Sequence, residues 1–207
     1  MSILMSFFGS APERPSLNPL AAGTSHRRGF SLFELLVVLS VISILAAIAL
    51  PKINLHQFRI DAGVRTVQGA LMQAERYAVQ RQHDMVVSFD VAGKRVITID
   101  DLNNNGAADA GEKVMNRPLE DGVRFLAPAV AIPGGTVAAV AGSKIKTLGG
   151  YPSVIFHRDG AVSSDLQVYI TSTRPNATDF KALNVTQSTG RVDFYSNSTG
   201  TWKRGGA

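Results

Sequence analysis

The chain has 207 residues and no cysteine, which excludes a disulfide-bonded scaffold and thiol catalysis. With 21 Lys and Arg residues against 16 Asp and Glu residues it is only mildly basic, whereas nucleic-acid-binding domains usually carry a more concentrated positive charge. This length allows one long helix and one globular domain of modest size.

The first predicted element is an apolar helix that follows a pair of cations. Arg27 and Arg28 precede a glycine, and residues 30–50 then form an almost uninterrupted apolar run before Pro51. At 1.5 Å per residue, a helix of about 21 residues reaches about 31 Å, enough to cross a bilayer. The two arginines predict that the N-terminal side stays cytoplasmic and the remainder is exported. Glu34 is unexpected, because a charge inside the bilayer costs about 2.5–3.5 kcal/mol and is usually functional.

Two simpler interpretations of this segment are open. It can be a plain membrane anchor, which leaves Glu34 unexplained. Alternatively, residues 32–46 can be the apolar region of an ordinary secretory signal, with the small residues 47–49 as its cleavage site. That interpretation requires a charge near the start of the apolar region and an unusually long segment before it.

The segment RRGFSLFE at residues 27–34 resembles the class III prepilin signal of type IV pilins and type II secretion pseudopilins. The resemblance implies that a prepilin peptidase cleaves between Gly29 and Phe30 and that Phe30 is then N-methylated. It further implies that Glu34 and Pro51 act in assembly, as the glutamate and proline usual in that family. There, the glutamate is thought to neutralise the terminal ammonium of a neighbouring subunit.

Beyond Pro51 the pattern predicts that the helix continues to about Gln82. Pro51 removes one backbone hydrogen bond and predicts a kink. The first half of the helix is apolar all round and must be buried in lipid or among other helices, whereas the second half is amphipathic and packs on its own domain. The apolar residues of this second half recur at spacings of three and four and share one face: Ile60, Val64, Val67, Leu71, Ala74 and Ala78.

From residue 85 onward the pattern changes to period two, which is typical of β-strands. A short turn at Ala92-Gly93 predicts a hairpin between the first two strands. The predicted strands are residues 85–90, 94–100, 123–126, 153–157, 166–171, 180–186 and 191–195. Residues 127–150 show no clear period and are either a surface loop or one more irregular strand.

A helix followed by antiparallel strands predicts an α+β, pilin-like fold, in which a long N-terminal α-helix packs on an antiparallel β-sheet domain. The helix end at 71–82, the Asp-x-Asn-x-Asn-Gly loop and the Gly-Arg-Val of the last predicted strand narrow the resemblance to the GspH/FimT family of minor pilins and pseudopilins. The predicted parts are a cleaved leader at 1–29, a transmembrane or filament-core helix at 30–51, an amphipathic helix at 52–83 and a periplasmic β-rich domain at 84–207.

The loop at residues 101–112 matches the pattern of a twelve-residue calcium loop, with a glycine, Gly106, at the sharp turn. A strand, not a helix, precedes the loop, so it is not a true EF-hand. The alternative is a solvated hairpin loop, in which Asn and Gly favour turn conformations. The candidate calcium ligands are Asp101, Asn103, Asn105, Asp109 and Glu112.

Catalytic motifs are missing from the sequence. The histidines at 26, 56, 83 and 157 follow no metal-ligand spacing, and the chain contains neither a GxSxG motif nor a phosphate-binding glycine loop. His157, next to Arg158 and Asp159, is interpreted as a residue at the end of a strand. We therefore expect no enzymatic activity, and no cofactor apart from the calcium ion considered above.

DNA capture is the competing function from another class. The resemblance includes pilins that bind DNA through a Gly-Arg-x-Arg motif. Residues 190–193 match this motif at Arg191, but Asp193 stands where the second arginine would be and would repel phosphate. Lys203 and Arg204 follow the only tryptophan and can supply charge beside a stacking ring, or this segment is simply a solubilising tail.

The sequence thus predicts a structural minor pseudopilin or pilin, processed by prepilin peptidase and assembled through its N-terminal helix, at or near the filament tip. The expected partners are the peptidase, other pilin-like subunits and the inner membrane, which the chain would cross once with its C-terminal domain in the periplasm. The alternative is a DNA-binding minor pilin of a natural-transformation pilus. Type II secretion and type IV pili share the same signal, helix and domain type, so both machines fit.

Overall fold

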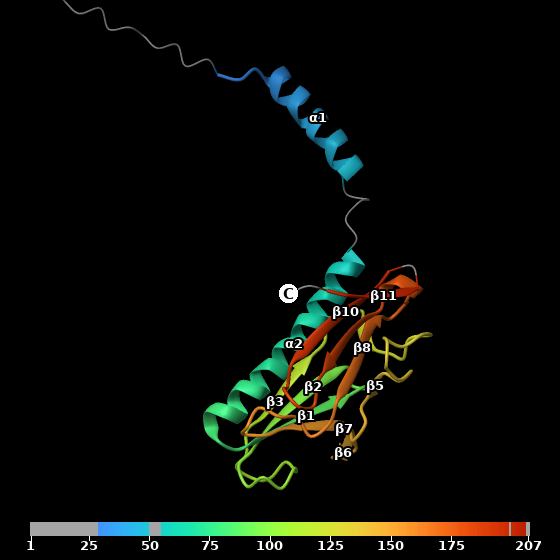
Figure 1. Cartoon of the computed structure of the whole chain (residues 1–207). Coiled ribbons are helices and arrows are strands. Elements are labelled where there is room, and N and C mark those ends of the chain that lie inside the picture. Colours follow the sequence, from blue (N-terminus) through green and yellow to red (C-terminus); the bar gives the residue numbers. More distant parts are fainter. Residues whose placement is uncertain (1–28, 50–54, 199, 206–207) are drawn as a thin grey trace, which may run out of the picture. The chain divides into compact units, whose positions relative to one another are not determined.

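A computed structural model describes residues 29–49, 55–198 and 200–205, and the chain divides between residues 50 and 51 into two compact units. The described part of the first unit contains helix α1 (Leu32–Ala49). The described part of the second unit contains helix α2 (Leu55–Arg81), strands β1 to β11 and a short 3-10 helix, η2 (Ala177–Asp179) (Figure 1). Arg27, Arg28 and Pro51, to which the sequence assigned orientation and a kink, lie outside the described residues.

Helix α1 starts with a local cap. The hydroxyl of Ser31 accepts a hydrogen bond from the backbone N–H of Glu34 at 3.0 Å, which satisfies one of the free donors of the first turn. The side chains of residues 32–47 are all exposed, with Phe33 at 74%. The apolar surface of α1 is therefore bare in the isolated chain.

Across the described residues, no helix is at once long enough and apolar enough to cross a membrane.

Helix α2 is amphipathic, as the spacing predicts. The six residues of the predicted stripe are buried, and Gly63 is buried with them. A Cβ atom at Gly63 would lie 2.9 Å from Cγ1 of Val123, so the glycine allows the helix to approach strand β4 closely. The helix ends at Arg81, and Gln82 follows with a left-handed φ of 61°, which agrees with the predicted end at about Gln82.

The strands form two antiparallel sheets, and α2 packs against both. In the first sheet the order is β3-β2-β1-β7-β6, and in the second it is β11-β10-β9-β8-β4, with β5 also paired to β8. The first-sheet bounds are β1 Asp84–Asp90, β2 Arg95–Asp101, β3 Val114–Pro118, β6 Lys146–Leu148 and β7 Tyr151–Phe156. The second-sheet bounds are β4 Val123–Phe125, β5 Val140–Ala141, β8 Leu166–Ser172, β9 Lys181–Val185, β10 Val192–Ser198 and β11 Thr201–Arg204.

The main core lies between α2 and the two sheets. Alternation along β1 places Met85, Val87 and Phe89 in this core, where the ring of Phe89 meets that of Phe125 edge-on at 5.9 Å. The intervening Val86 belongs to a smaller apolar cluster with Ile99 and Ile155. This helix-on-sheet architecture confirms the predicted α+β fold class.

All seven predicted strands are present, with boundaries shifted by one to three residues, but β3, β5, β6 and β11 were not predicted. The segment 127–150 contains β5 and β6 and is otherwise irregular. Its loop is fastened to the second sheet, because the backbone N–H of Ile132 donates to Oη of Tyr169 at 3.2 Å and Nε1 of Trp202 donates to the carbonyl of Val130 at 2.8 Å. Burial raises the pKa of the Tyr169 phenol above its ordinary value.

The predicted hairpin between β1 and β2 is closed by Asp90. Its Oδ1 accepts the backbone N–H of Gly93 at 2.7 Å, and its Oδ2 accepts Nε of Arg95 at 2.8 Å. The hydrogen bond from Gly93 and then the contact with Arg95 hold the pKa of the Asp90 carboxyl below its ordinary 3.8, against the opposing effect of burial. A side chain at Gly93 would collide with this carboxylate, since a Cβ would lie 2.3 Å from Oδ2.

We expect Asp90→Asn to lower the stability of the fold in a pH-dependent way. Because the folded pKa is depressed, the carboxylate stabilises the fold fully above its unfolded pKa and loses this effect as pH falls through the folded pKa. Urea unfolding of the full chain in detergent should therefore separate wild type from variant at pH 7 and bring them together at the acid end. Asp121→Asn, at an exposed carboxylate, is the control, and an equal gap at both pH values would contradict the assigned role of Asp90.

Candidate functional site

The predicted cleavage pair, Gly29 and Phe30, lies directly before α1 and is exposed. Phe30 has 81% of its surface exposed, and among the described residues other than Gly29 and its chain neighbours no heavy atom lies within 4 Å of a Cβ built at Gly29. The peptide bond between these two residues is therefore open to an external enzyme.

Glu34 is exposed in the first turn of α1, one turn after the cleavage pair. A carboxylate at this end of a helix is favoured by the helix dipole, whose positive end lies at the N-terminus. Glu34 thus has a local stabilising role in addition to the assembly role that the resemblance implies.

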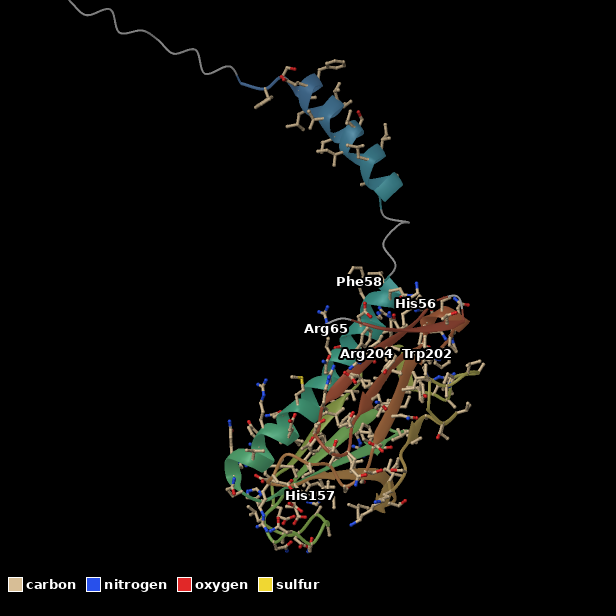
Figure 2. The ribbon with its side chains drawn as sticks, in the orientation of Figure 1. His56, Phe58, Arg65, His157, Trp202 and Arg204 are labelled. Atoms are coloured by element: carbon tan, nitrogen blue, oxygen red, sulfur yellow. The ribbon has the colours of Figure 1, made fainter. Side chains whose placement is uncertain are left out.

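A groove of about 730 Å³ lies between α2 and the last strands of the second sheet. Asp61 and Arg65 of α2 line one side, and Lys181, Arg191 and Arg204 line the other. In Figure 2, Arg65 and Arg204 lie toward the end of the domain where α2 begins, whereas His157 lies at the opposite end. The groove therefore combines four cations with the carboxylates of Asp61 and Asp193.

Asp193 joins two of these cations. Its Oδ1 lies 3.0 Å from Nε of Arg191 and 2.6 Å from a terminal guanidinium nitrogen of Arg204. The hydrogen bond to Asp193 raises the pKa of the Arg204 guanidinium further above its ordinary value. On the same side, Nζ of Lys181 lies 3.8 Å from Oδ1 of Asp61 and 5.7 Å from the centroid of the Phe194 ring. Asp193, which stands where the motif has its second arginine, is thus paired with two arginines, so its charge is not free to repel a phosphate.

The interpretation of the last residues as a free basic tail is wrong. Trp202, Lys203 and Arg204 belong to β11, which pairs with β10. The Trp202 ring meets Tyr169 edge-on at 5.7 Å and is therefore part of the packing. The structure brings Arg204 next to Arg191 but leaves Lys203 exposed outside the groove. The turn-forming residues 197–200 were the sequence signal for this hairpin.

The predicted calcium ligands do gather in one loop, but the loop uses their oxygens internally. The two carboxylate oxygens of Asp101 accept the backbone N–H groups of Asn105 and Gly106 at 3.0 and 2.6 Å. Glu112 accepts those of Leu102 and Asp109, both at 2.9 Å.

Asp109 is also satisfied within the loop. Its Oδ2 accepts the side-chain amides of Asn103 at 2.8 Å and Asn105 at 2.5 Å, which lower the pKa of the Asp109 carboxyl. Throughout the part of the chain that the structure describes, no three His, Cys, Asp or Glu side chains form a group that could hold a metal ion. The described loop is thus a hairpin loop held by its own side chains, and calcium binding at these residues stays a prediction.

The histidines are separated in space. Nδ1 of His157 lies 2.9 Å from Oδ2 of Asp84, just after the end of β7 as expected. Nδ1 of His83 lies 3.2 Å from Oδ1 of Asp100, and His56 is exposed on α2. His26 lies outside the described residues. The His83–Asp100 and His157–Asp84 pairs each connect neighbouring elements at one end of the domain. Neither pair belongs to a catalytic motif of the sequence.

Comparison with known proteins gives matches both to the N-terminal segment that contains α1 and to the domain that contains α2 and the sheets. The prokaryotic N-terminal methylation motif matches residues 24–50. A curated relative, the pilin-like protein PilA1 of Thermus thermophilus, is 30% identical over 89 residues, which cover 42% of this chain. The match spans 56% of that relative's length.

Two solved structures also resemble the chain. The minor pseudopilin EpsH from the type 2 secretion system of Vibrio cholerae is 12% identical with a TM-score of 0.41, covering 69% of this chain and 94% of EpsH. The type IV minor pilin FimU of Pseudomonas aeruginosa is 11% identical with a TM-score of 0.45, covering 70% of this chain and 92% of FimU.

The family described as type II transport protein GspH matches residues 63–191, which include most of α2 and the strands up to the start of β10. This match covers more than half of the chain. The GspH family is a family of structural, non-enzymatic pseudopilins, which agrees with the prediction that the chain is not an enzyme. The chain belongs to the GspH family.

Proposed function

We propose that the protein is a structural minor subunit of a type II secretion pseudopilus or a type IV pilus, located at or near the filament tip. One observation carries this proposal: α1 directly follows an exposed Gly29–Phe30 bond, and its side chains from 32 to 47 are all exposed. An apolar helix of this kind needs lipid or other helices around it, because apolar surface is strongly driven out of water.

The matched methylation motif supports the same order of events. It implies processing by a prepilin peptidase, anchoring in the inner membrane before assembly, and assembly with other pseudopilins. In our proposal the domain that contains α2 and the two sheets waits in the periplasm. The α1 helices then exchange lipid for a shared filament core, and the ammonium of Phe30 pairs with Glu34 of a neighbour to fix the register.

The test is a strain that lacks the gene, together with the same strain complemented by the wild-type gene. Retention of normally exported enzymes in the periplasm would support a role in a pseudopilus, whereas loss of surface pili would support a role in a type IV pilus. Antibody labelling of sheared filaments would test the position at the tip. Normal secretion, normal piliation and absence of the protein from filaments would together contradict the proposal.

DNA binding is a second candidate function, and the groove is the observation that favours it. Arg204 supplies, from β11, a guanidinium beside Arg191 at the point where the motif has lost its second arginine. With Arg65 and Lys181, four cations line the groove against two carboxylates. A phosphate backbone requires such clustered positive charge, although Asp193 and Asp61 offset half of it here.

We expect Arg191→Ala combined with Arg204→Ala to weaken binding of double-stranded DNA by the purified full chain. Each lost phosphate contact should reduce the slope of log affinity against log salt by about 1, because fewer counterions are released. Fluorescence polarisation over a salt series measures both effects. Lys146→Ala, at an exposed cation on β6, is the control. Binding that is undetectable in wild type, or reduced equally by the control, would exclude the groove as a DNA site.

A further inference from the structure

One end of the second unit combines exposed apolar side chains with exposed cations. Leu55 and Phe58, in the first turn of α2, are 62% and 67% exposed, and Arg59 beside them is also exposed. Figure 2 shows Phe58 and His56 together at this end of the helix. We call the surface formed by Leu55, Phe58, Arg59, Arg174 and Lys203 the α2-start surface.

Hydrogen bonds fix the neighbouring turn against this part of α2. Nε2 of Gln57 donates to Oδ1 of Asp179 at 3.3 Å, and the backbone N–H of Thr173 donates to the carbonyl of Gly122 at 2.9 Å. A Cβ at Gly122 would lie only 3.6 Å from the guanidinium of Arg59. Arg174, which follows Thr173, is therefore held beside the first turns of the helix.

At this end of the second unit, the cations of the α2-start surface have no ion-pair partner among the residues that the structure describes, whereas most carboxylates nearby do. Within the described residues, Arg59, Arg174 and Lys203 make no ion pair, and all three are exposed. Glu120 and Asp121, which precede Gly122 in the chain, are exposed carboxylates. The remaining carboxylates nearby already have partners: Asp61 with Lys181, Asp179 with Gln57, and Asp193 with Arg191 and Arg204.

The sequence also limits how far this surface can move from α1. Only residues 50–54 separate the last residue of α1, Ala49, from the first residue of α2, Leu55. Six residue steps of fully extended chain reach about 20 Å. Once α1 is anchored in a bilayer, Leu55 at the start of this surface therefore stays within about 20 Å of the end of α1.

We propose that, before assembly, the α2-start surface lies on the periplasmic leaflet of the membrane that holds α1. Leu55 and Phe58 enter the boundary between headgroups and acyl chains, and Arg59, Arg174 and Lys203 bind the phosphates of anionic lipids. Apolar side chains flanked by Lys and Arg are the chemistry that interfacial binding uses. This inference rests on the proposed membrane-anchored state and adds an orientation of the domain, with β11 facing the lipid.

The absence of cysteine makes this orientation measurable with single spin labels on the full chain. Thr201→Cys places a label at an exposed position of β11, and Leu102→Cys places one on an exposed loop residue next to the first sheet. The protein is reconstituted in nanodiscs of phosphatidylcholine, with or without phosphatidylglycerol. In the anionic bilayer we expect the label at position 201 to lose accessibility to a water-soluble nickel chelate and gain accessibility to oxygen, while the label at 102 stays aqueous.

Charge reversal separates lipid binding from simple tethering. Arg174→Glu combined with Lys203→Glu should return the label at position 201 to water, whereas Lys144→Glu combined with Lys146→Glu, at exposed lysines away from this end, should leave it shielded. Equal accessibility at position 201 in both bilayers, or equal release by both double variants, would overturn the proposal. Failure of the anchoring itself would appear separately, as protein that does not incorporate into nanodiscs.

Discussion

Protein carrying Gly29→Leu is expected to remain at precursor size in cells and to be absent from sheared filaments. The Gly29–Phe30 bond is exposed and Gly29 adds no side chain before it, whereas leucine would place a branched side chain against the peptidase. An uncleaved chain would also keep Arg27 and Arg28 next to the apolar helix. Each charge drawn into an apolar environment costs about 2.5–3.5 kcal/mol, so we expect loss of assembly to be nearly complete.

Intact-mass measurement and immunoblotting of membrane fractions report this block as retention of the leader, residues 1–29. Gly29→Ala is the matched control, because it keeps a small side chain and should be processed. Ser31→Ala removes the cap of α1 without changing the cleaved bond, and it should also yield the mature form. Mature-size protein from Gly29→Leu would show that the cleavage site lies elsewhere.

The helices and strands in which apolar residues recur at a regular spacing were predictable from the sequence. The stripe from Ile60 to Ala78 follows helical spacing because these side chains pack against two sheets, and all of its predicted members are buried. The alternation in 85–90 likewise placed Phe89 in the core. In both cases the apolar residues of one face meet the core, which makes the periodicity readable; the opposite face of α2 meets solvent, whereas that of β1 is also buried.

The strands that were not predicted are short or lie at sheet edges; β3 and β5 pair with strands distant in sequence, whereas β6 and β11 form hairpins with β7 and β10. Strands β5 and β6 contain two and three residues, too few to show a period, and they exist because β8 and β7 offer free hydrogen-bonding edges. Strand β3 alternates exposed and half-buried residues and ends at Pro118, which fits the edge of a sheet. No local pattern encodes the pairing of β3 with β2 or of β5 with β8.

The same limitation applied to the candidate site. Gly29, Phe30 and Glu34 are close enough in sequence to be recognised as a motif, but the groove combines side chains from α2, β9, β10 and β11. From the sequence, the negative charge of Asp193 predicted repulsion of a phosphate. The β10–β11 hairpin brings Arg204 next to Asp193, and the guanidinium of Arg204 offsets this negative charge. A charge judged from its position in a motif can therefore be misread when its partner comes from another strand.

Glu34→Leu is expected to leave processing intact and to reduce incorporation into filaments by at least about tenfold. The variant removes the carboxylate that, in our proposal, pairs with the Phe30 ammonium of a neighbour inside the helix core. Removal of one partner of a desolvated ion pair costs about 3–5 kcal/mol, because the other charge is left unpaired. The ratio of filament-bound to membrane-bound protein, measured by quantitative immunoblotting after shearing, reports this loss.

The position of Glu34 in the first turn of α1 gives it a second, local effect that must be separated from assembly. A carboxylate near a helix N-terminus contributes about 0.3–1 kcal/mol, far less than the pairing requires. Ser31→Ala, which loses a capping bond of similar size, should therefore incorporate nearly normally, and Ser43→Leu should show that added apolar volume alone is tolerated. If Glu34→Leu incorporates as well as Ser31→Ala does, the carboxylate only stabilises the start of the helix, and register must be set by the packing of the apolar side chains of α1.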